Sequence, residues 1–160
     1  MKLLAREPGR LVFHLSAKDR NAIRALLRRA AEVGRSPSPI SRGPLAALPE
    51  DAQELLDAER LAEWNRFHTD VATWLDDPAR CVAGKGGFGL TLSDADAEIL
   101  LQALNSAKVG FWEALGSPDL ENGDELAPTT DNISHLFAIE RASLYVATLV
   151  IALQGDQPNA

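Results

Sequence analysis

The side chains best suited to metal binding or nucleophilic chemistry are few and scattered. The chain has three histidines and one cysteine. His14, His68 and His135 fall in three different predicted elements, and none forms an HxxxH or ExxH pair that would place two ligands on one helix face. Cys81 precedes a glycine-rich turn, so no helix N-terminus is there to activate its thiol. The sequence therefore predicts no metal centre, no catalytic residue and no cofactor.

Two further features resemble parts of known sites. The segment AGKGGFG, residues 83–89, has the glycines and lysine of a phosphate-binding loop. In such loops the lysine follows the glycines and a helix begins at once. Here Lys85 precedes the glycine pair and an alternating apolar run follows, which predicts a β-hairpin turn. Glu59, Glu63 and Asp70 share one side of a predicted helix, which is typical of a solvated acidic face.

Three arginines form the sharpest surface feature. Arg20, Arg24 and Arg28 recur one helical turn apart, away from the apolar face of the same helix. The stripe has three readings: a solvated face, a protein contact (including the acidic remainder of a second copy) and a nucleic-acid contact. A pI near 4.9 and the lack of interleaved aromatic residues disfavour nucleic acid. If the stripe joins protomers, replacing these arginines by glutamine should weaken self-association.

Local patterns place these residues on specific elements. Leu11, Phe13 and Leu15 alternate after the turn at residues 7–10, which predicts a hairpin. Ser16, with Asp19 three residues later, predicts the start of a helix that stops near residue 34. A proline-rich linker at 35–49 then leads to a helix at about 50–76. Much of that helix is expected in the core through one apolar stripe: Leu61, Trp64, His68, Val71 and Leu75.

The second half repeats this order. A hairpin at about 80–92 is followed by Ser93 as N-cap, with Asp96 three residues on. The helix that follows carries Leu100, Leu101, Leu104, Ala107 and Phe111 on one face and should end near residue 116. A polar loop leads to a last helix at about 131–153. Its final turns are apolar nearly all round, which predicts a central position or a subunit contact.

Residues 9–33 align with residues 86–110 at a constant offset, with identical residues that include both N-cap serines. We therefore predict a mainly helical α+β fold built from two repeated ββαα units in a single domain, 1–77 and 78–160. The alternative is that any two capped amphipathic helices that follow a strand look alike. The two hairpins could join edge to edge or pack on opposite sides of the helices.

Composition sets the broad class. The chain has 160 residues, 46% of them apolar, and a net charge of −7, as in an ordinary globular protein. Ten basic and three acidic residues lie up to residue 43, against six and twenty beyond it. The absence of a recognisable secretion signal and the single cysteine predict a cytoplasmic protein. The longest apolar run, residues 142–153, is too short for a membrane span.

The segment around residues 90–115 resembles an uncharacterised bacterial domain of unknown function, known chiefly from actinobacteria. That family has a strand entering a helix of the form LxxxEAExxLxALNxxR, and Lys108 stands near the place of its arginine. The resemblance implies a hairpin-and-helix fold and brings no catalytic residues. The matching residues are Leu92, Ala97, Glu98, Leu101, Ala103, Leu104 and Asn105.

Taken together, these observations predict a non-enzymatic protein–protein interaction or regulatory module. Its expected partner is itself, as a homodimer, or another protein, rather than nucleic acid or a membrane. The alternative is an enzyme or small-ligand-binding protein whose site is assembled from scattered residues.

Overall fold

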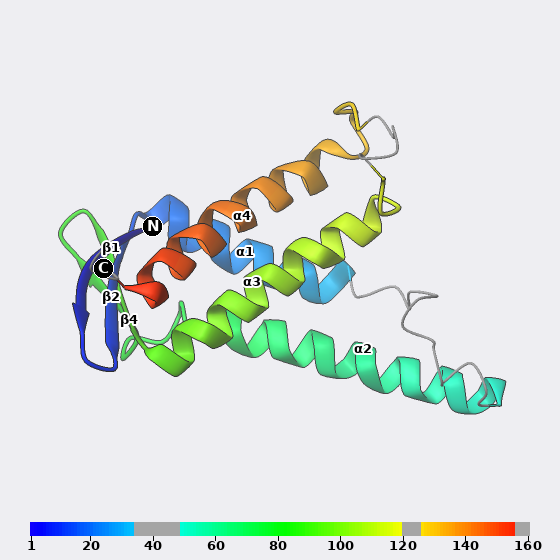
Figure 1. The fold of residues 1–160 in the computed structure, drawn as a ribbon, viewed down its shortest axis with the longest axis horizontal. Helices are drawn as coiled ribbons and strands as arrows, with labels where there is room; N and C mark the ends of the chain where they lie inside the picture. Colours follow the sequence, from blue (N-terminus) through cyan, green and yellow to red (C-terminus); the bar gives the residue numbers. More distant parts are fainter. Residues whose placement is uncertain (34–48, 120–125, 156–160) are drawn as a thin grey trace, which may run out of the picture.

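Strands and helices alternate in pairs along the chain. A computed structural model describes residues 1–33, 49–119 and 126–155, so the predicted linker lies almost wholly outside the described residues. The fold is α+β, as predicted, with helix as the main element (Figure 1). The elements are β1 (Lys2–Glu7), β2 (Arg10–Leu15), α1 (Ala17–Val33), α2 (Glu50–Thr73), β3 (Cys81–Gly84), β4 (Gly87–Ser93), α3 (Asp94–Ala114) and α4 (Ile133–Gln154).

Both predicted hairpins form, and they join edge to edge into one antiparallel sheet of order β1-β2-β4-β3. At the centre of the sheet β2 pairs with β4, with Phe13 opposite Leu90 and Leu11 opposite Leu92. These four side chains are at most 1% exposed and face the helices. On the other face of the sheet, the strand residues that alternate with these, such as His14, are only partly buried. Of the two arrangements considered from sequence, the edge-to-edge one is present.

Capping explains why α1 and α3 begin where they do. The backbone amide of Asp19 donates to Ser16 Oγ over 3.0 Å, and Ser16 Oγ donates in return to the Asp19 carboxylate over 2.8 Å. At the start of α3, the backbone amide of Asp96 donates to Ser93 Oγ over 3.0 Å. Each serine thus satisfies an amide that the first helical turn leaves unpaired. Both predicted caps are confirmed.

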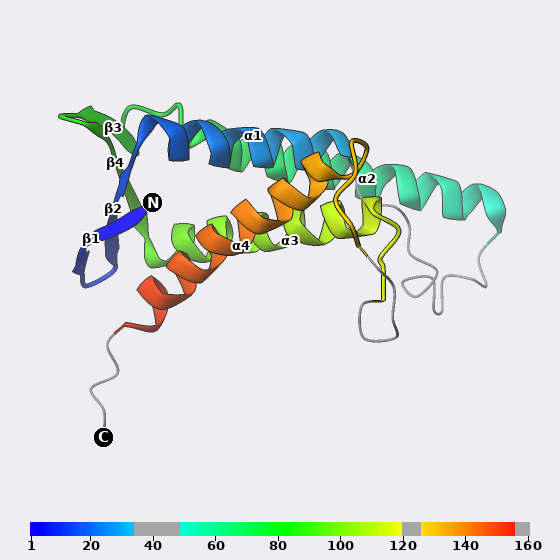
Figure 2. The same ribbon diagram turned by 90° about the horizontal axis from the view of Figure 1, so that it is seen from above.

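The helices form two antiparallel pairs that extend away from the sheet. Figure 2 shows α1 and α2 on one side and α3 and α4 on the other, with the sheet across one end. The core lies between these layers, and burial of its apolar surface is the main term that stabilises the fold. The largest fully buried side chains include Phe13, Leu27, Leu75, Leu104, Phe111 and Leu149.

The prediction that much of α2 is core is wrong for its first half. The helix buries only His68, Val71 and Ala72, while Leu55 is 65% and Leu61 42% exposed. The start of α2 extends beyond the ends of the other three helices (Figures 1 and 2). Apolar residues at helical spacing are buried only where a neighbouring element lies against them.

A central position for α4 is also wrong. One face of α4 packs on α3 through residues such as Ala142 and Leu149, both fully buried. The opposite face is open, and Ile151 in the last turn is 70% exposed. The helix lies at the outside of the molecule (Figure 1).

Candidate interaction surfaces

The predicted arginine stripe is gathered around one carboxylate. Arg20 Nη2 and Arg24 Nη1 each lie 2.7 Å from Asp76 Oδ1, and Arg28 Nη2 lies 3.4 Å from Asp76 Oδ2. Asp76 belongs to the turn that follows α2. The sequence pattern indicates the arginines but not this partner, which is about fifty residues away along the chain.

Arg20 is the most firmly held of the three arginines. Its Nε donates to the carbonyl of Leu75 over 2.7 Å, and its guanidinium lies 4.6 Å from the centre of the Phe88 ring. Arg24 and Arg28 reach further into solvent, with 31% and 57% of their side chains exposed. The stripe therefore connects α1 to the end of α2, and three guanidinium charges meet a single carboxylate charge.

The three histidines lie apart. His68 is fully buried, with Nδ1 2.9 Å from the carbonyl of Trp64 and Nε2 3.0 Å from Ser106 Oγ. It thereby joins α2 to α3, and burial lowers its pKa despite the opposing effect of the Trp64 carbonyl. His14 lies on β2 and His135 on α4. Across residues 1–33, 49–119 and 126–155, no three His, Cys, Asp or Glu side chains gather as metal ligands.

Cys81 is the first residue of β3 and only 7% exposed. Burial raises the pKa of its thiol, although the nearby Arg20 guanidinium acts in the opposite direction. A buried, protonated thiol is a poor nucleophile. The geometry assigns Cys81 to the core.

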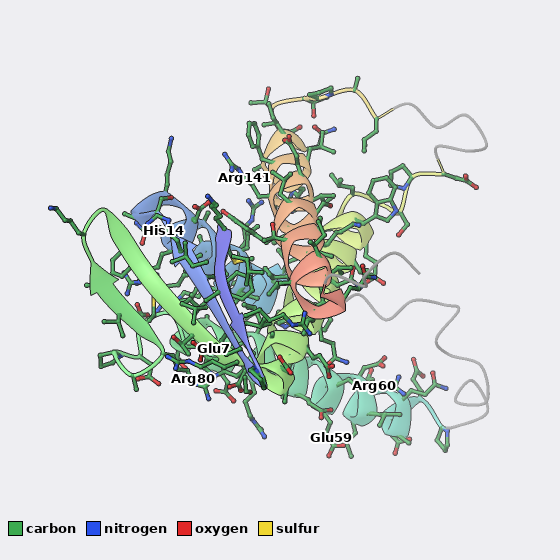
Figure 3. All side chains as sticks on the ribbon, turned by 60° about the vertical axis from the view of Figure 1, so that its left-hand side comes forward. Glu7, His14, Glu59, Arg60, Arg80 and Arg141 are labelled. Atoms are coloured by element: carbon green, nitrogen blue, oxygen red, sulfur yellow. The ribbon has the colours of Figure 1, made fainter. Side chains whose placement is uncertain are left out.

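The glycine-rich segment and the acidic residues of α2 lie at or near the surface. Lys85 and Gly86 form the turn between β3 and β4. A side chain at Gly87 would collide with the carbonyl of Leu15, so the glycine permits close approach of the two hairpins. Glu59, Glu63 and Asp70 are exposed, and Figure 3 shows Glu59 on the outlying part of α2.

A link between α1 and α4 was not predicted. Tyr145 Oη donates to Asp19 Oδ1 over 3.0 Å, and the Met1 ammonium lies 2.9 Å from Asp19 Oδ2. Burial alone would raise the pKa of Asp19, but hydrogen bonds from Met1, Ser16 and Tyr145 outweigh it and lower the pKa to about 2. Burial and this bond raise the pKa of Tyr145 to about 12.

The outer face of α4 carries the largest exposed apolar side chains of that helix. Phe137 is 58%, Leu144 54% and Ile151 70% exposed, and Ile133 in the first turn is 44% exposed. All of them lie on one line of outward-facing residues whose spacing alternates between four and three. We call this line the α4 stripe; its members are Ile133, Phe137, Glu140, Leu144, Ala147, Ile151 and Gln154.

A shallow groove of about 610 Å³ runs beside this face, between α3 and α4. Ile99 and Leu101 line it from α3, and Val146 and Val150 line it from α4. Its polar lining comes from α3 alone, at Glu98, Gln102 and Asn105. The groove thus extends the apolar surface of the α4 stripe onto α3.

Contrary to the prediction from the apolar run at 142–153, the whole of α4, with 22 residues, is long and apolar enough to cross a membrane, with a mean hydropathy of 1.8 over its most apolar window, of which 28% is buried. Length and composition alone carry little weight, because core helices of globular proteins share them.

No protein-family model, curated protein or solved structure matches this chain. The resemblance to an actinobacterial domain therefore stays a prediction.

Proposed function

We propose that this chain is a non-enzymatic protein–protein interaction module of the cytoplasm, and that its partner is a second copy of itself. The observation that carries the proposal is the α4 stripe. Exposed apolar surface costs about 25 cal/mol for each Å² left in water, so burying it against a partner is favourable. Several large apolar side chains exposed on one face are a feature of protein interfaces.

The α1 arginines are the second candidate surface for a partner. Their excess of positive charge would attract an acidic region, and the chain beyond residue 43 is acidic. Asp76 already neutralises part of that charge, and Arg20 is committed to its own chain. Exposed ion pairs contribute only about 0 to 1 kcal/mol each. The α4 stripe therefore gives the stronger contact.

An enzyme or small-ligand-binding protein remains the rival proposal. The groove between α3 and α4 is the feature that favours it. Its lining is mainly apolar, and its one ionisable side chain is Glu98. A site for acid–base or nucleophilic chemistry needs several such groups converging on one point. An apolar surface that continues onto the α4 stripe suits a protein partner better.

We also propose that the fold arose by duplication of a ββαα unit, with halves at 1–77 and 78–160. The element order, the N-cap serines Ser16 and Ser93, and the antiparallel pairing of β2 with β4 at the sheet centre support it. The second helices differ, because α2 extends past its neighbours and α4 does not. Duplication would have left the two helices free to acquire separate roles.

Self-association is tested by measuring the mass of the protein in solution over a range of concentrations. The wild type should be a dimer, and Leu144→Glu should be a monomer, because the charge would be buried in the contact. Leu55→Glu is the matched control: Leu55 is 65% exposed on α2, outside the stripe. This variant should remain dimeric. A wild type that stays monomeric at high concentration would refute the proposal.

A further inference from the structure

Building on the proposed function, we infer that the two copies pack α4 against α4 through the α4 stripe in antiparallel orientation, with the twofold axis at the level of Ala142 along the helix. The first support is the spacing of the α4 stripe. Alternating steps of four and three residues average 3.5, which is the repeat of helices that pack along each other as a coiled coil. Five of the seven stripe residues are apolar. The stripe thus has the pattern of a helix–helix seam along its whole length.

The charge on the stripe selects the orientation. Glu140 is the one ionisable residue of the stripe, and it lies near the middle of α4. In a parallel, in-register pair each residue faces its own copy, so two Glu140 carboxylates would meet inside the contact. Like charges placed together in a desolvated interface are strongly unfavourable. An antiparallel pair separates the two carboxylates along the helix axis.

Side-chain size selects the register. Ile133 and Ile151 lie equally far from Ala142, as do Phe137 and Ala147. An antiparallel pair centred at Ala142 therefore places Ile133 opposite the second copy's Ile151, and the large Phe137 opposite the second copy's small Ala147. All five apolar residues of the stripe then face the partner. Large-against-small contacts are how helix layers interdigitate without voids.

The same register provides a partner for Glu140. It faces Leu144 of the second copy, and Arg141 of that copy lies one helical turn away. Arg141 is exposed on α4, where it also interacts with Tyr145 of its own chain, and it is visible on that helix in Figure 3. Two symmetric Glu140–Arg141 pairs at the edge of the contact would offset the cost of bringing the carboxylates out of water.

A lipid surface suits the stripe less well than a second copy does. Helices that lie in a membrane interface carry lysine and arginine on their polar face and bind anionic lipid. Arg141 is the only lysine or arginine within α4, Glu140 interrupts the apolar face, and the whole chain has a net charge of −7. These charges oppose binding to an anionic membrane.

Cysteine cross-linking tests orientation and register. In a Cys81→Ala background, Ile133→Cys and Ile151→Cys are prepared separately, oxidised alone, and oxidised after mixing and subunit exchange. In the antiparallel pair the two different cysteines face each other, while identical cysteines are about 27 Å apart along the axis, at 1.5 Å per residue. We expect a cross-linked dimer only from the mixture. Spin labels at Ile151, added in the same background, should report a correspondingly long distance.

The possible failures are distinguishable. A dimer in which each variant cross-links to itself, and whose Ile151 labels lie close together, would be parallel; it would overturn this inference and leave the proposed function intact. A dimer with no cross-link in any sample and no defined label distance would overturn the α4 contact. A monomer that floats with phosphatidylcholine vesicles would overturn both proposals. Melting curves of each variant check that the fold is kept.

Discussion

Two exposed helix faces of this protein differ in how much the rest of the chain covers them. On α1, three arginines stand out in the sequence, yet their guanidinium groups converge on Asp76 of the same chain. On α4, the stripe is unremarkable within a generally apolar helix, yet Phe137 and Ile151 remain 58% and 70% exposed. The conspicuous pattern is largely used within the fold, and the inconspicuous one stays exposed to solvent.

The difference shows that residue type alone does not identify an interaction surface. A charged side chain in water needs no partner, so its exposure says little. A large apolar side chain left in water costs free energy, so several on one face call for an explanation. Paired substitutions test this contrast. One pair compares the buried and the open face of α4, and a second pair compares the shared carboxylate with one arginine of the α1 cluster.

The largest expected effect separates the two faces of α4. Leu149→Ala removes a fully buried side chain and should lower the free energy of unfolding by about 2 to 5 kcal/mol. Ile151→Ala, two residues along on the open face, should change it by less than ~0.5 kcal/mol at concentrations where the protein is monomeric. Chemical denaturation at low and high protein concentration measures both. A large loss for Ile151→Ala in the monomer would show that this face is already covered.

A smaller effect is expected in the arginine cluster. Asp76→Asn removes the carboxylate that three guanidinium groups share and should destabilise the fold by about 1 to 2 kcal/mol, since the charges would then repel one another. Arg28→Gln removes the most exposed arginine of the cluster and should cost less than ~0.5 kcal/mol. Thermal unfolding at low and high salt is the measurement. Equal losses for the two variants would contradict the idea of a shared central carboxylate.

The smallest effect concerns the contact between the two helices that carry these faces. Tyr145→Phe deletes the hydrogen bond to Asp19 and should lower the free energy of unfolding by about 1 kcal/mol, measured by chemical denaturation.

The same carboxylate predicts a pH dependence of stability. The pKa of Asp19 is lowered from 3.8 to about 2, so the unfolded chain takes up the proton first as pH falls. The stability due to the carboxylate is therefore complete above about pH 4 and is lost between about pH 4 and pH 2. Denaturation across this range should give a shallower pH dependence for Asp19→Asn than for the wild type.

Features governed by neighbouring residues could be predicted from the sequence. The two hairpins follow from alternating apolar residues around glycine turns, and the starts of α1 and α3 follow from Ser16 and Ser93. In each of these elements the stabilising contacts lie within a few residues of one another. The α+β class and the edge-to-edge option for the hairpins came from the same local signals.

Features that depend on distant neighbours could not be predicted. Leu61 has the spacing of a core residue but is 42% exposed, because it lies in the first half of α2, and that helix buries no residue before His68. The Asp76 partner of the arginines and the Tyr145 partner of Asp19 lie far away in sequence. In α4, apolar residues occur all round, so the sequence could not show which face α3 would cover. Packing against α3 determines which face of α4 is buried.

The pairing of β2 with β4 has a consequence for how the chain is made. Phe13 and Leu90 meet at the centre of the sheet, and α1 and α2 lie between them in sequence. During synthesis the edge of β2 that pairs with β4 has no partner strand until the ribosome has synthesised β4. Contacts so distant along the chain form slowly, and a bare strand edge can be taken by another nascent chain. Completion of the sheet is therefore the step at which folding competes with exchange of hairpins between molecules.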